Sequence, residues 1–573
     1  MNRFSKLLNS TPLSGSGLLV ALMVGASSVL GGDFLKAQTT AASDVASSQP
    51  VRGRIVDADV GTTLPCRLYI STADESKWYF AKTDAPQGSS LPYDRAVGKS
   101  IERHVTLSAH PFRLELPPGR YKLVAEHGKE YRPETLAFQV TDQPLDLEVK
   151  LQRWVDMPTR GWYSGDTHVH RALPDLPNVL QAEDLHIIYP MSQWITRARE
   201  LPSAGTVDPQ LAASQHADFA PIQVSPNRFI VPLNSEYEIF SVNDRRHTLG
   251  AILVLGQSAP LPTGIPPLRA VADAARRQGA LLDLEKHSWA WTPVVAPVMK
   301  VDLYPLSNNH VWRVPFAFGQ WTLENNWRDN PRIETGPQGF TEWGWLHFGW
   351  EQYYALLNCG LRLRPTAGTG NAVHPVPAGF SRVYVRLGTE PMSAPAWQQR
   401  LNEGRSFVTT GPMLDLSLDD QPFGGVHQPS VAWQAGRPAT VRIHGEILSA
   451  VPLERIELVA AGEVAAVLKP ANQVEGRLYR TRLDQPFTAD GATWLAVRCF
   501  EQRADGRPRF AHSAPAFLDL PGASLRPRRD QVHYLLQRCE SEIDRNQQVL
   551  TAEELAEYRE AAEFYRRQLP TAR

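Results

Sequence analysis

Alternation of apolar and polar residues marks two β-rich regions near the two ends of the chain. Residues 51–153 contain short runs such as FRLEL and YKLVAEHG, which alternate in polarity and are separated by turn residues. Residues 416–522 return to the same pattern in ATVRIHGEI and TWLAVRCFE. Short alternating strands between frequent turns predict an antiparallel β-sandwich for each region.

Residues 154–415 instead combine apolar strands with amphipathic helices. ALLDL, MKVDLYPL and FIVPLNSEYEIF are candidate buried strands, and WEQYYALLNCG is a candidate helix. Residues 266–279 predict a clear amphipathic helix with Gly279 beyond its end. Helices that alternate with apolar strands predict an α/β region with a mostly parallel sheet or barrel. In such a barrel, the strand ends and the loops after them build the site.

The N-terminal segment has the pattern of a secretory signal peptide. Arg3 and Lys6 precede the apolar run GLLVALMVGASSVLGG, and cleavage is expected near residue 38. The apolar run is short for a membrane-spanning helix. We therefore expect residues 1–38 to be a signal peptide, residues 39–50 a linker, and the protein to be periplasmic or secreted. We expect no stable membrane insertion after cleavage.

Residues 523–573 are charged and helical in pattern. Thr551 and Glu554 have the spacing of a capping box, which marks the start of a helix. We expect two antiparallel helices here, packed on the rest of the protein. Their charges are mixed in sign, and the whole chain of 573 residues has a formal net charge of −1. A nucleic-acid partner normally requires a basic patch or stripe, so none is expected.

The four cysteines do not form a recognisable metal or disulfide motif. They are Cys66, Cys359, Cys499 and Cys539, far apart and without a C-x-x-C pair. We therefore expect buried free thiols, and neither a cysteine zinc site nor a disulfide framework. Nothing in the sequence predicts an oligomeric state.

The segment WYSGDTHVHR places Asp166, His168 and His170 at alternate positions near the end of an extended run. Alternate residues of a strand point to the same face, so these side chains would face one spot. A surface strand with solvated histidines is the alternative. The choice depends on whether other parts of the chain supply more ligands.

Further candidate ligands recur where strands should begin or end. Glu236 and Glu238 are two apart on one strand, and His247 begins the next, so we expect a hairpin in which carboxylate and imidazole meet at one end. Which glutamate is the ligand is left open. The full set of candidate metal ligands is His168, His170, Glu236, His247, His287, His310 and His374. This set suits Zn²⁺, Mn²⁺ or Fe²⁺ and exceeds the needs of a single tetrahedral ion. One or two ions are expected, and Glu236 would bridge a pair.

GWYSGDTHVHR resembles the first motif of the PHP (polymerase and histidinol phosphatase) metallohydrolase superfamily. With the NSE hairpin and the YYALLNCG…AGTG segment, it is similar to the carbaryl-hydrolase-like CehA/McbA branch. The resemblance implies a distorted (β/α)7 barrel with metal at the strand C-termini. It assigns His168 and His170 as the first ligand pair, followed by Glu236, His247 and His287. GRIVDADVGTTLPCRLYI and LPPGRYKLVAEHG resemble a carboxypeptidase regulatory-like sandwich.

Two departures from the superfamily pattern concern the second ion. IIYPMSQW stands where a Thr-Asp-His turn is common, and GTGNAVH lacks the aspartate of a common Asp-x-His motif. Asn371 and His374 remain at the latter place. These departures leave open whether a complete binuclear centre forms.

The leading hypothesis is an exported hydrolase that uses metal-bound hydroxide on ester, amide or carbamate bonds. Asp166 is the first catalytic candidate, either orienting a ligand histidine or handling a proton, and Glu238 is the second. Arg171 could hold an anionic substrate. Their structural alternatives are a turn cap, a solvated carboxylate and a salt bridge, respectively.

The expected substrate is a small molecule or is glycan-like. Few cationic residues lie near the motifs, which favours a carbonyl substrate over a phosphoester. A PHP-type phosphoesterase is one alternative. The other is a non-catalytic module that binds glycans or a cell surface and has a degraded metal site.

Overall fold

The computed structural model describes residues 48–573 except for a few short stretches. The stretches left out are 99, 214–218, 309–310, 312–326, 328–329, 338 and 430–431. The expected signal peptide and most of the linker therefore lie outside the described residues. None of the helices that the structure describes is long and apolar enough to span a membrane.

Residues 49–153 form two β-sheets with a shared hydrophobic core. The strands are β1 (Gln49–Asp57), β2 (Cys66–Thr72), β3 (Trp78–Tyr79), β4 (Lys82–Thr83), β5 (Ser90–Val97), β6 (Ser100–Leu107), β7 (Phe112–Leu116), β8 (Gly119–Glu126), β9 (Tyr131–Arg132), β10 (Glu134–Val140) and β11 (Leu145–Arg153). One sheet has the order β4-β7-β1-β11-β9 and the other β10-β8-β2-β6-β5, with β3 beside β2. Ile55 and Leu151 of the first sheet share a buried cluster with Leu68 and Leu123 of the second. The alternating pattern thus buries one face of each sheet.

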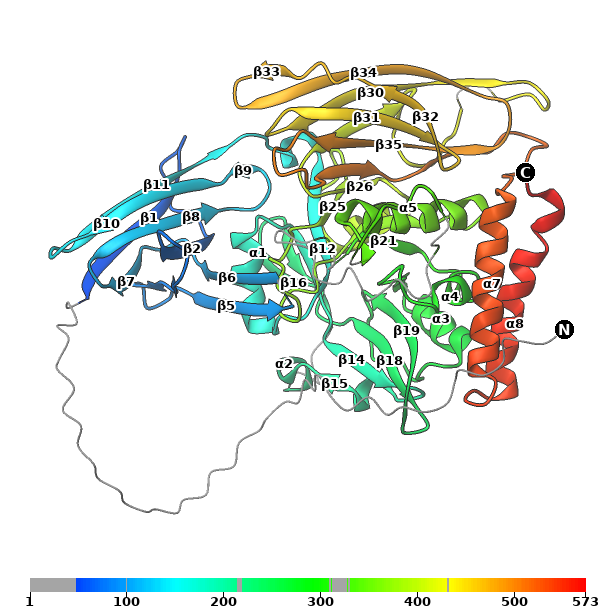
Figure 1. Ribbon diagram of the computed structural model, residues 1–573, viewed down its shortest axis with the longest axis horizontal. Helices are drawn as coiled ribbons and strands as arrows, with labels where there is room; N and C mark the ends of the chain where they lie inside the picture. Colours follow the sequence, from blue (N-terminus) through cyan, green and yellow to red (C-terminus); the bar gives the residue numbers. More distant parts are fainter. Residues whose placement is uncertain are drawn as a thin grey trace, which may run out of the picture. The chain divides into compact units, whose positions relative to one another are not determined.

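The described residues of the middle region form six α-helices, strands of two larger sheets, and a separate two-stranded sheet of β22 and β23. Figure 1 shows this region mostly in cyan and green. The strands are β12 (Trp162–Val169), β13 (Ile187–Pro190), β14 (Gln193–Arg197), β15 (Thr206–Val207), β16 (Ile222–Ser225), β17 (Arg228–Ile230), β18 (Ser235–Val242), β19 (Arg245–Leu255), β20 (Leu281–Asp283), β21 (Leu303–Ser307), β22 (Thr335–Gly336), β23 (Gly339–Phe340), β24 (Arg364–Ala367), β25 (Arg382–Arg386) and β26 (Ser406–Thr409). The helices are α1 (Leu176–Ala182), α2 (Pro209–Ala213), α3 (Leu268–Arg277), α4 (Thr292–Met299), α5 (Glu342–Asn358) and α6 (Ala394–Asn402). The predicted helices at 266–279 and around WEQYYALLNCG are therefore confirmed as α3 and α5.

The described strands of the middle region do not form the single closed barrel that the resemblance implies. One sheet includes β16-β17-β13-β12-β25-β26, and the other has the order β15-β14-β18-β19-β20-β21-β24. Several neighbours are antiparallel, including β18 with β19, because residues 243–244 alone connect them. A parallel pair would need a long crossover, so this short turn dictates an antiparallel hairpin.

The two sheets are nevertheless joined beside the end of β12. The segment after β24 runs alongside it: His170 N donates to Asn371 O at 2.8 Å, and Gly370 N donates to His168 O at 2.7 Å. On the other side, the chain passes directly from β13 in one sheet to β14 in the other. The end of β12 therefore lies where both sheets can contribute side chains.

The C-terminal β-region shares a sheet with the middle region. Its strands are β27 (Met413–Leu418), β28 (Gln421–Pro422), β29 (Gly425–Val426), β30 (Ala439–Ser449), β31 (Leu453–Ala460), β32 (Glu463–Leu468), β33 (Gln473–Glu475), β34 (Leu478–Ala489), β35 (Thr493–Glu501), β36 (Phe510–Ser513) and β37 (Ala516–Leu518). One sheet has the order β28-β27-β30-β34-β33. The sheet that contains β12 continues from β26 through β36, β35 and β31 to β32. A continuous sheet thus crosses the expected boundary at residues 415–416.

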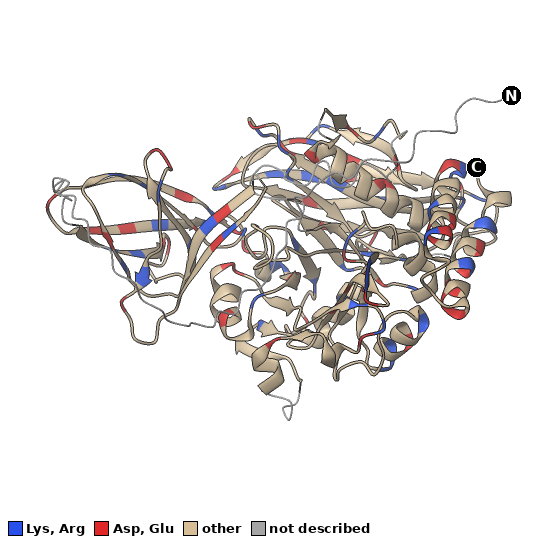
Figure 2. Ribbon diagram, turned by 60° about the horizontal axis from the view of Figure 1, so that its bottom comes forward, with Lys and Arg blue, Asp and Glu red and all other residues tan. Residues whose placement is uncertain are grey.

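Two long helices complete the chain, α7 (Arg529–Asn546) and α8 (Ala552–Arg566), and Figure 1 shows them side by side. The predicted capping box is confirmed: Thr551 and Glu554 hydrogen-bond each other's backbone at the start of α8. Tyr565 donates a hydrogen bond to Pro293 O at 2.9 Å, which fastens α8 to α4. Figure 2 shows acidic and basic residues interspersed along both helices. All four cysteines are buried free thiols, as expected.

Candidate metal centre

His168 and His170 lie together at the end of β12. Their side chains lie on the same face of the strand, as the alternation predicts. Their Nε2 atoms are 3.1 Å apart. Both side chains are at least 90% buried. Burial lowers the pKa of His168 to about 3 and that of His170 to about 4. Near neutral pH both rings are therefore uncharged, which is the form that binds metal.

Glu236, near the start of β18, completes a group of three potential ligands. Its Oε2 atom lies 3.5 Å from His168 Nε2 and 3.2 Å from His170 Nε2. The side chain is buried, and this oxygen receives no hydrogen bond from the residues that the structure describes. Two imidazole nitrogens and a carboxylate oxygen that converge in this way suit a divalent transition metal. The donor set therefore fits the expected ion.

Asp166 supports this group through the backbone. Its carboxylate accepts hydrogen bonds from Thr369 Oγ1 at 2.6 Å, Gly379 N at 2.8 Å and His168 N at 3.1 Å. Burial raises its pKa to about 6, against the effect of these hydrogen bonds. These partners are a hydroxyl group and backbone amides, and none of them is an imidazole. Asp166 is therefore a positioning residue that ties the end of β12 to the loop after β24.

A second group shares Glu236 and consists of carboxylates around an ammonium. Glu236, Glu238 and Glu285 bring carboxylate oxygens within 4.8 Å of one another. Lys286 Nζ lies 2.9 Å from Glu238 Oε1 and 2.8 Å from Glu285 Oε1. Trp194 Nε1 donates to the other Glu238 oxygen at 3.2 Å. Glu238, predicted as catalytic or solvated, is thus buried and fully engaged.

Charge and burial shift the pKa values in this second group. Burial raises the pKa of Glu285 well above its ordinary value, and Lys286 opposes that rise. Burial also raises the pKa of Glu238. For Lys286, burial acts to lower the pKa, but Glu238, Glu285 and Glu236 outweigh it and raise the pKa above its ordinary value. Lys286 is therefore held as a cation.

Sequence reasoning missed Glu285 and did not assign a role to Lys286. A signal was present, because Asp283, Glu285 and His287 alternate after a buried strand, as Asp166, His168 and His170 do. Asp283 is also buried and accepts a hydrogen bond from Thr366 Oγ1 at 2.7 Å. The spacing alone could have nominated Glu285. Its neighbour Lys286 could not be nominated in this way, because adjacent residues in an extended chain face opposite sides.

The expected meeting of Glu236 and His247 at one end of the hairpin is wrong. Glu236 pairs with Leu253 across β18 and β19. His247 lies six residues earlier on β19, which at about 3.3 Å per residue is roughly 20 Å away. It lies near the turn, where its Nε2 is 2.7 Å from Asn546 Oδ1 of α7. His247 therefore connects the hairpin to the C-terminal helices.

His287 and His374 lie outside both ligand groups among the described residues. His287 is buried among aromatic rings, with its ring centroid 4.6 Å from that of Trp345 and 5.3 Å from that of Phe348. Burial lowers the pKa of His374 well below its ordinary value, and nearby Lys286, His170 and His168 lower it further. Its loop pairs with the end of β12, because Asn371 forms bridges with both Val169 and His374. His310 lies outside the described residues.

Arg171 has structural partners, as its salt-bridge alternative predicted. Its Nη1 atom is 3.5 Å from Asp175 Oδ2, and its Nε donates to Asn371 Oδ1 at 2.9 Å. The guanidinium also lies 4.7 Å from the ring centroid of Tyr93. Tyr93 itself donates to His374 O and accepts from Ala372 N at 3.1 Å. The N-terminal β-region therefore contacts the loop that borders the candidate metal centre.

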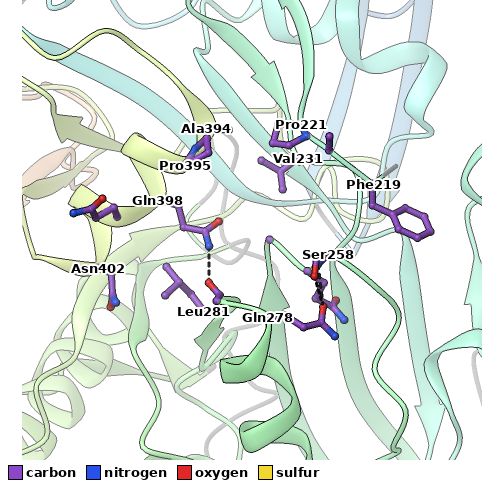
Figure 3. Close-up of a pocket in the computed structure, with 15 residues that line it drawn as sticks. Phe219, Pro221, Val231, Ser258, Gln278, Leu281, Ala394, Pro395, Gln398 and Asn402 are labelled. Atoms are coloured by element: carbon purple, nitrogen blue, oxygen red, sulfur yellow. Dashed lines mark hydrogen bonds between the residues drawn. The ribbon is translucent and has the colours of Figure 1, made fainter. Parts of the chain in front are cut away.

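A cavity of about 400 Å³ elsewhere in the middle region has no comparable chemistry (Figure 3). Its lining includes Gln257, Gln278, Gln398 and Asn402, and none of its lining residues is ionisable. Gln398 Nε2 donates to Gly279 O at 3.0 Å across it. The cavity shares no residue with either ligand group, so the buried His/Glu cluster is the candidate centre.

A scan of known protein families found no matching family. A search of curated proteins found no match either. Among solved structures, the chain is similar to a two-domain protein from Bacteroides vulgatus that contains a predicted PHP-like metal-dependent phosphoesterase. The identity is 10%, the alignment covers 63% of this chain and 95% of that chain, and the TM-score is 0.27.

Proposed function

We propose that this protein is a metal-dependent hydrolase whose ion is held by His168, His170 and Glu236. The observation that carries the proposal is the convergence of two neutral imidazole nitrogens and a carboxylate oxygen, with separations of 3.1–3.5 Å, in a buried position. The resemblance of GWYSGDTHVHR to the first PHP motif supports the same ligands.

A divalent ion in this place would supply an activated water molecule and polarise the bond under attack. The protein's own residues prepare the position. Burial keeps His168 and His170 unprotonated, so no proton must leave before they bind. Asp166 fixes the backbone of His168 against the loop after β24. His374 lies on the same loop, next to Asn371, which pairs with the end of β12.

The charges around the centre favour ester, amide or carbamate bonds over phosphoesters. Catalysis on phosphate usually employs cations that contact the transferred group. Arg171 is paired with Asp175, and Lys286 is paired with Glu238 and Glu285. Arg245 and Arg246 are exposed beside the β18–β19 turn, the end of the hairpin away from Glu236. Each of these cations is thus occupied or remote.

Metal analysis combined with turnover tests the proposal. The purified full-length protein, loaded with Zn²⁺, Mn²⁺ or Fe²⁺, should hydrolyse members of a panel of aryl esters, amides and carbamates. Turnover of phosphomonoesters alone would reverse the substrate assignment and favour the phosphoesterase alternative. Absence of both bound metal and turnover would instead favour a binding module.

Export is part of the proposal, because the first 38 residues have the charged, apolar and small-residue order of a signal peptide. Sequencing the N-terminus of protein from its native host should give a start near residues 38–45. A mature protein that retains Met1 and is recovered from the cytoplasm would contradict export without affecting the metal assignment.

A further inference from the structure

Lys286 contacts two of the three carboxylates of the group where a second metal ion would be expected. Its Nζ atom contacts Glu238 and Glu285 at 2.9 and 2.8 Å, and the whole side chain is 93% buried. Glu285 and Glu238 belong, with Glu236, to the second group that could hold an ion. Two of the three carboxylates that would bind this ion therefore already contact a cation supplied by the chain.

The backbone conformation of Glu285 positions this lysine. Glu285 has φ of 55°, in the left-handed region that residues other than glycine adopt at a cost. In an extended chain, Glu285 and Lys286 would point to opposite faces. The left-handed residue breaks the alternation, so both side chains reach the same group and Glu285 Oε1 contacts the Nζ of its neighbour. Thr292 Oγ1 donates to Lys286 O at 3.1 Å and holds the strained segment in place.

Charge balance leads to the same conclusion. The two groups together contain the carboxylates of Glu236, Glu238 and Glu285 and the imidazoles of His168 and His170. A single divalent ion between His168, His170 and Glu236, together with the Lys286 ammonium, supplies three positive charges, which is enough to balance the three carboxylates even when all of them are ionised. A second divalent ion beside Lys286 would leave buried excess positive charge, which is costly in a region of low dielectric.

We infer that the Lys286 ammonium takes the place of the second ion, so the centre is mononuclear. This inference rests on the proposed function, because it assumes that the first ion binds. It replaces the binuclear arrangement with a bridging Glu236 that the sequence favours. Glu238 and Glu285 then act as partners of Lys286 and have no role as ligands.

The test is the metal content of the full-length protein after saturation with Zn²⁺ and removal of free ion. Wild-type protein should retain a single ion per chain, and Mn²⁺-loaded protein should give the electron paramagnetic resonance spectrum of an isolated ion. Lys286→Met, which removes the charge and keeps most of the side chain, should bind a second ion per chain. Lys129→Met is a matched control, because Lys129 Nζ donates to Thr410 O at 3.2 Å and touches neither group.

The outcomes separate this inference from the proposed function. No ion in the wild type would overturn the proposed function itself. Two ions in the wild type, or a spin-coupled Mn²⁺ pair, would overturn only the inference about Lys286. Folded Lys286→Met with an unchanged single ion would also overturn it. If that variant does not fold, the number of ions in the wild type and its Mn²⁺ spectrum still show whether the centre holds one ion or two.

Discussion

The two groups that share Glu236 differ in what lies opposite the carboxylate. On one side, His168 and His170 present ring nitrogens to Glu236, and His168 Nδ1 also lies 3.8 Å from Glu285 Oε1; among the described residues, no lysine or arginine forms an ion pair with Glu236. On the other side, Glu238 and Glu285 contact the ammonium of Lys286. Both groups are buried and both contain enough donors to be metal candidates.

A count of donor atoms therefore does not define a metal site. A buried carboxylate needs a compensating positive charge, and either a metal ion or a lysine can supply it. The histidine group lacks such a charge and is suited to receive one. The lysine group already has one. The expected consequences differ for each group, and the experiments below exploit that difference.

The largest effect is expected from removing the histidines. His168→Ala with His170→Ala should abolish binding of the first ion, a loss well beyond the roughly 100-fold caused by losing a residue that only supports a ligand. Binding is measured by titration calorimetry with Zn²⁺, and circular dichroism should show retained β-structure. His247→Ala is the matched control, since this imidazole is on the same hairpin as Glu236 but contacts Asn546. Equal loss in both variants would refute the ligand assignment.

A smaller effect is expected from Asp166→Asn, because Asp166 acts only through the backbone of His168 and the loop after β24. Metal affinity and turnover should fall by roughly 10–100-fold. The comparison variant is Asp283→Asn, which alters a buried aspartate that is likewise bonded to a threonine but lies on β20. That change should leave Zn²⁺ affinity nearly intact. A loss for Asp166→Asn far above 100-fold would indicate general acid–base catalysis.

The stability of the fold should respond to pH in opposite directions through two buried residues, His186 and Asp283. Burial lowers the pKa of His186, next to β12, to about 3, so only the unfolded state takes up its proton below about pH 6.5. Its contribution therefore destabilises the fold by about 2 kcal/mol between pH 7 and pH 5. Burial raises the pKa of Asp283 to about 7, so the folded state retains a proton that the unfolded state has lost. That contribution destabilises the fold as the pH rises from 5 to 7, again by about 2 kcal/mol.

Urea unfolding of metal-free protein at several pH values measures these slopes. His186→Asn should remove the loss at low pH, and Asp283→Asn should remove the loss toward neutral pH. Slopes that change in the same direction in both variants would show that the burial of one of these groups has been misassigned.

The smallest effect is expected from Tyr93→Phe, which removes the hydroxyl that contacts His374 O and Ala372 N. The free energy of unfolding should fall by about 1 kcal/mol, the usual net contribution of a hydrogen bond. Zn²⁺ affinity should fall slightly, because the loop borders the histidine group. Tyr121→Phe removes a similar bond to Pro117 O at 2.7 Å within the N-terminal β-region. Tyr121→Phe should lower the free energy of unfolding without changing Zn²⁺ affinity. An equal loss of Zn²⁺ affinity in both variants would contradict a specific effect of the contact between Tyr93 and the loop.

Local patterns predicted several parts of this molecule well. The amphipathic period located α3, and the Thr551–Glu554 spacing located the start of α8. The alternation in GDTHVH placed His168 and His170 on one side, because two residues on one strand keep their relative direction whatever the strand packs against. Glu236 was also found, although its separation from His170 along the chain gave no measure of distance.

The failures concern features that no local pattern specifies. The pairing of β18 with β19 depends on the position of the turn, and this register placed His247 against α7 instead of beside Glu236. The division of the central strands between two sheets, and the extension of one sheet into the C-terminal β-region, depend on which strands meet after folding.

The donor types, the paired histidines and the helices could be predicted from the sequence, because they depend on side-chain chemistry and on backbone periods of a few residues. Only the tertiary structure decided that Glu236 meets the histidines, that Asp166 and Arg171 are held by structural partners, and that Lys286 lies among carboxylates. The physical reason is that burial and charge compensation are properties of a site assembled from distant segments. A single left-handed residue at Glu285 was enough to turn Lys286 inward, and the strand period gives no warning of it.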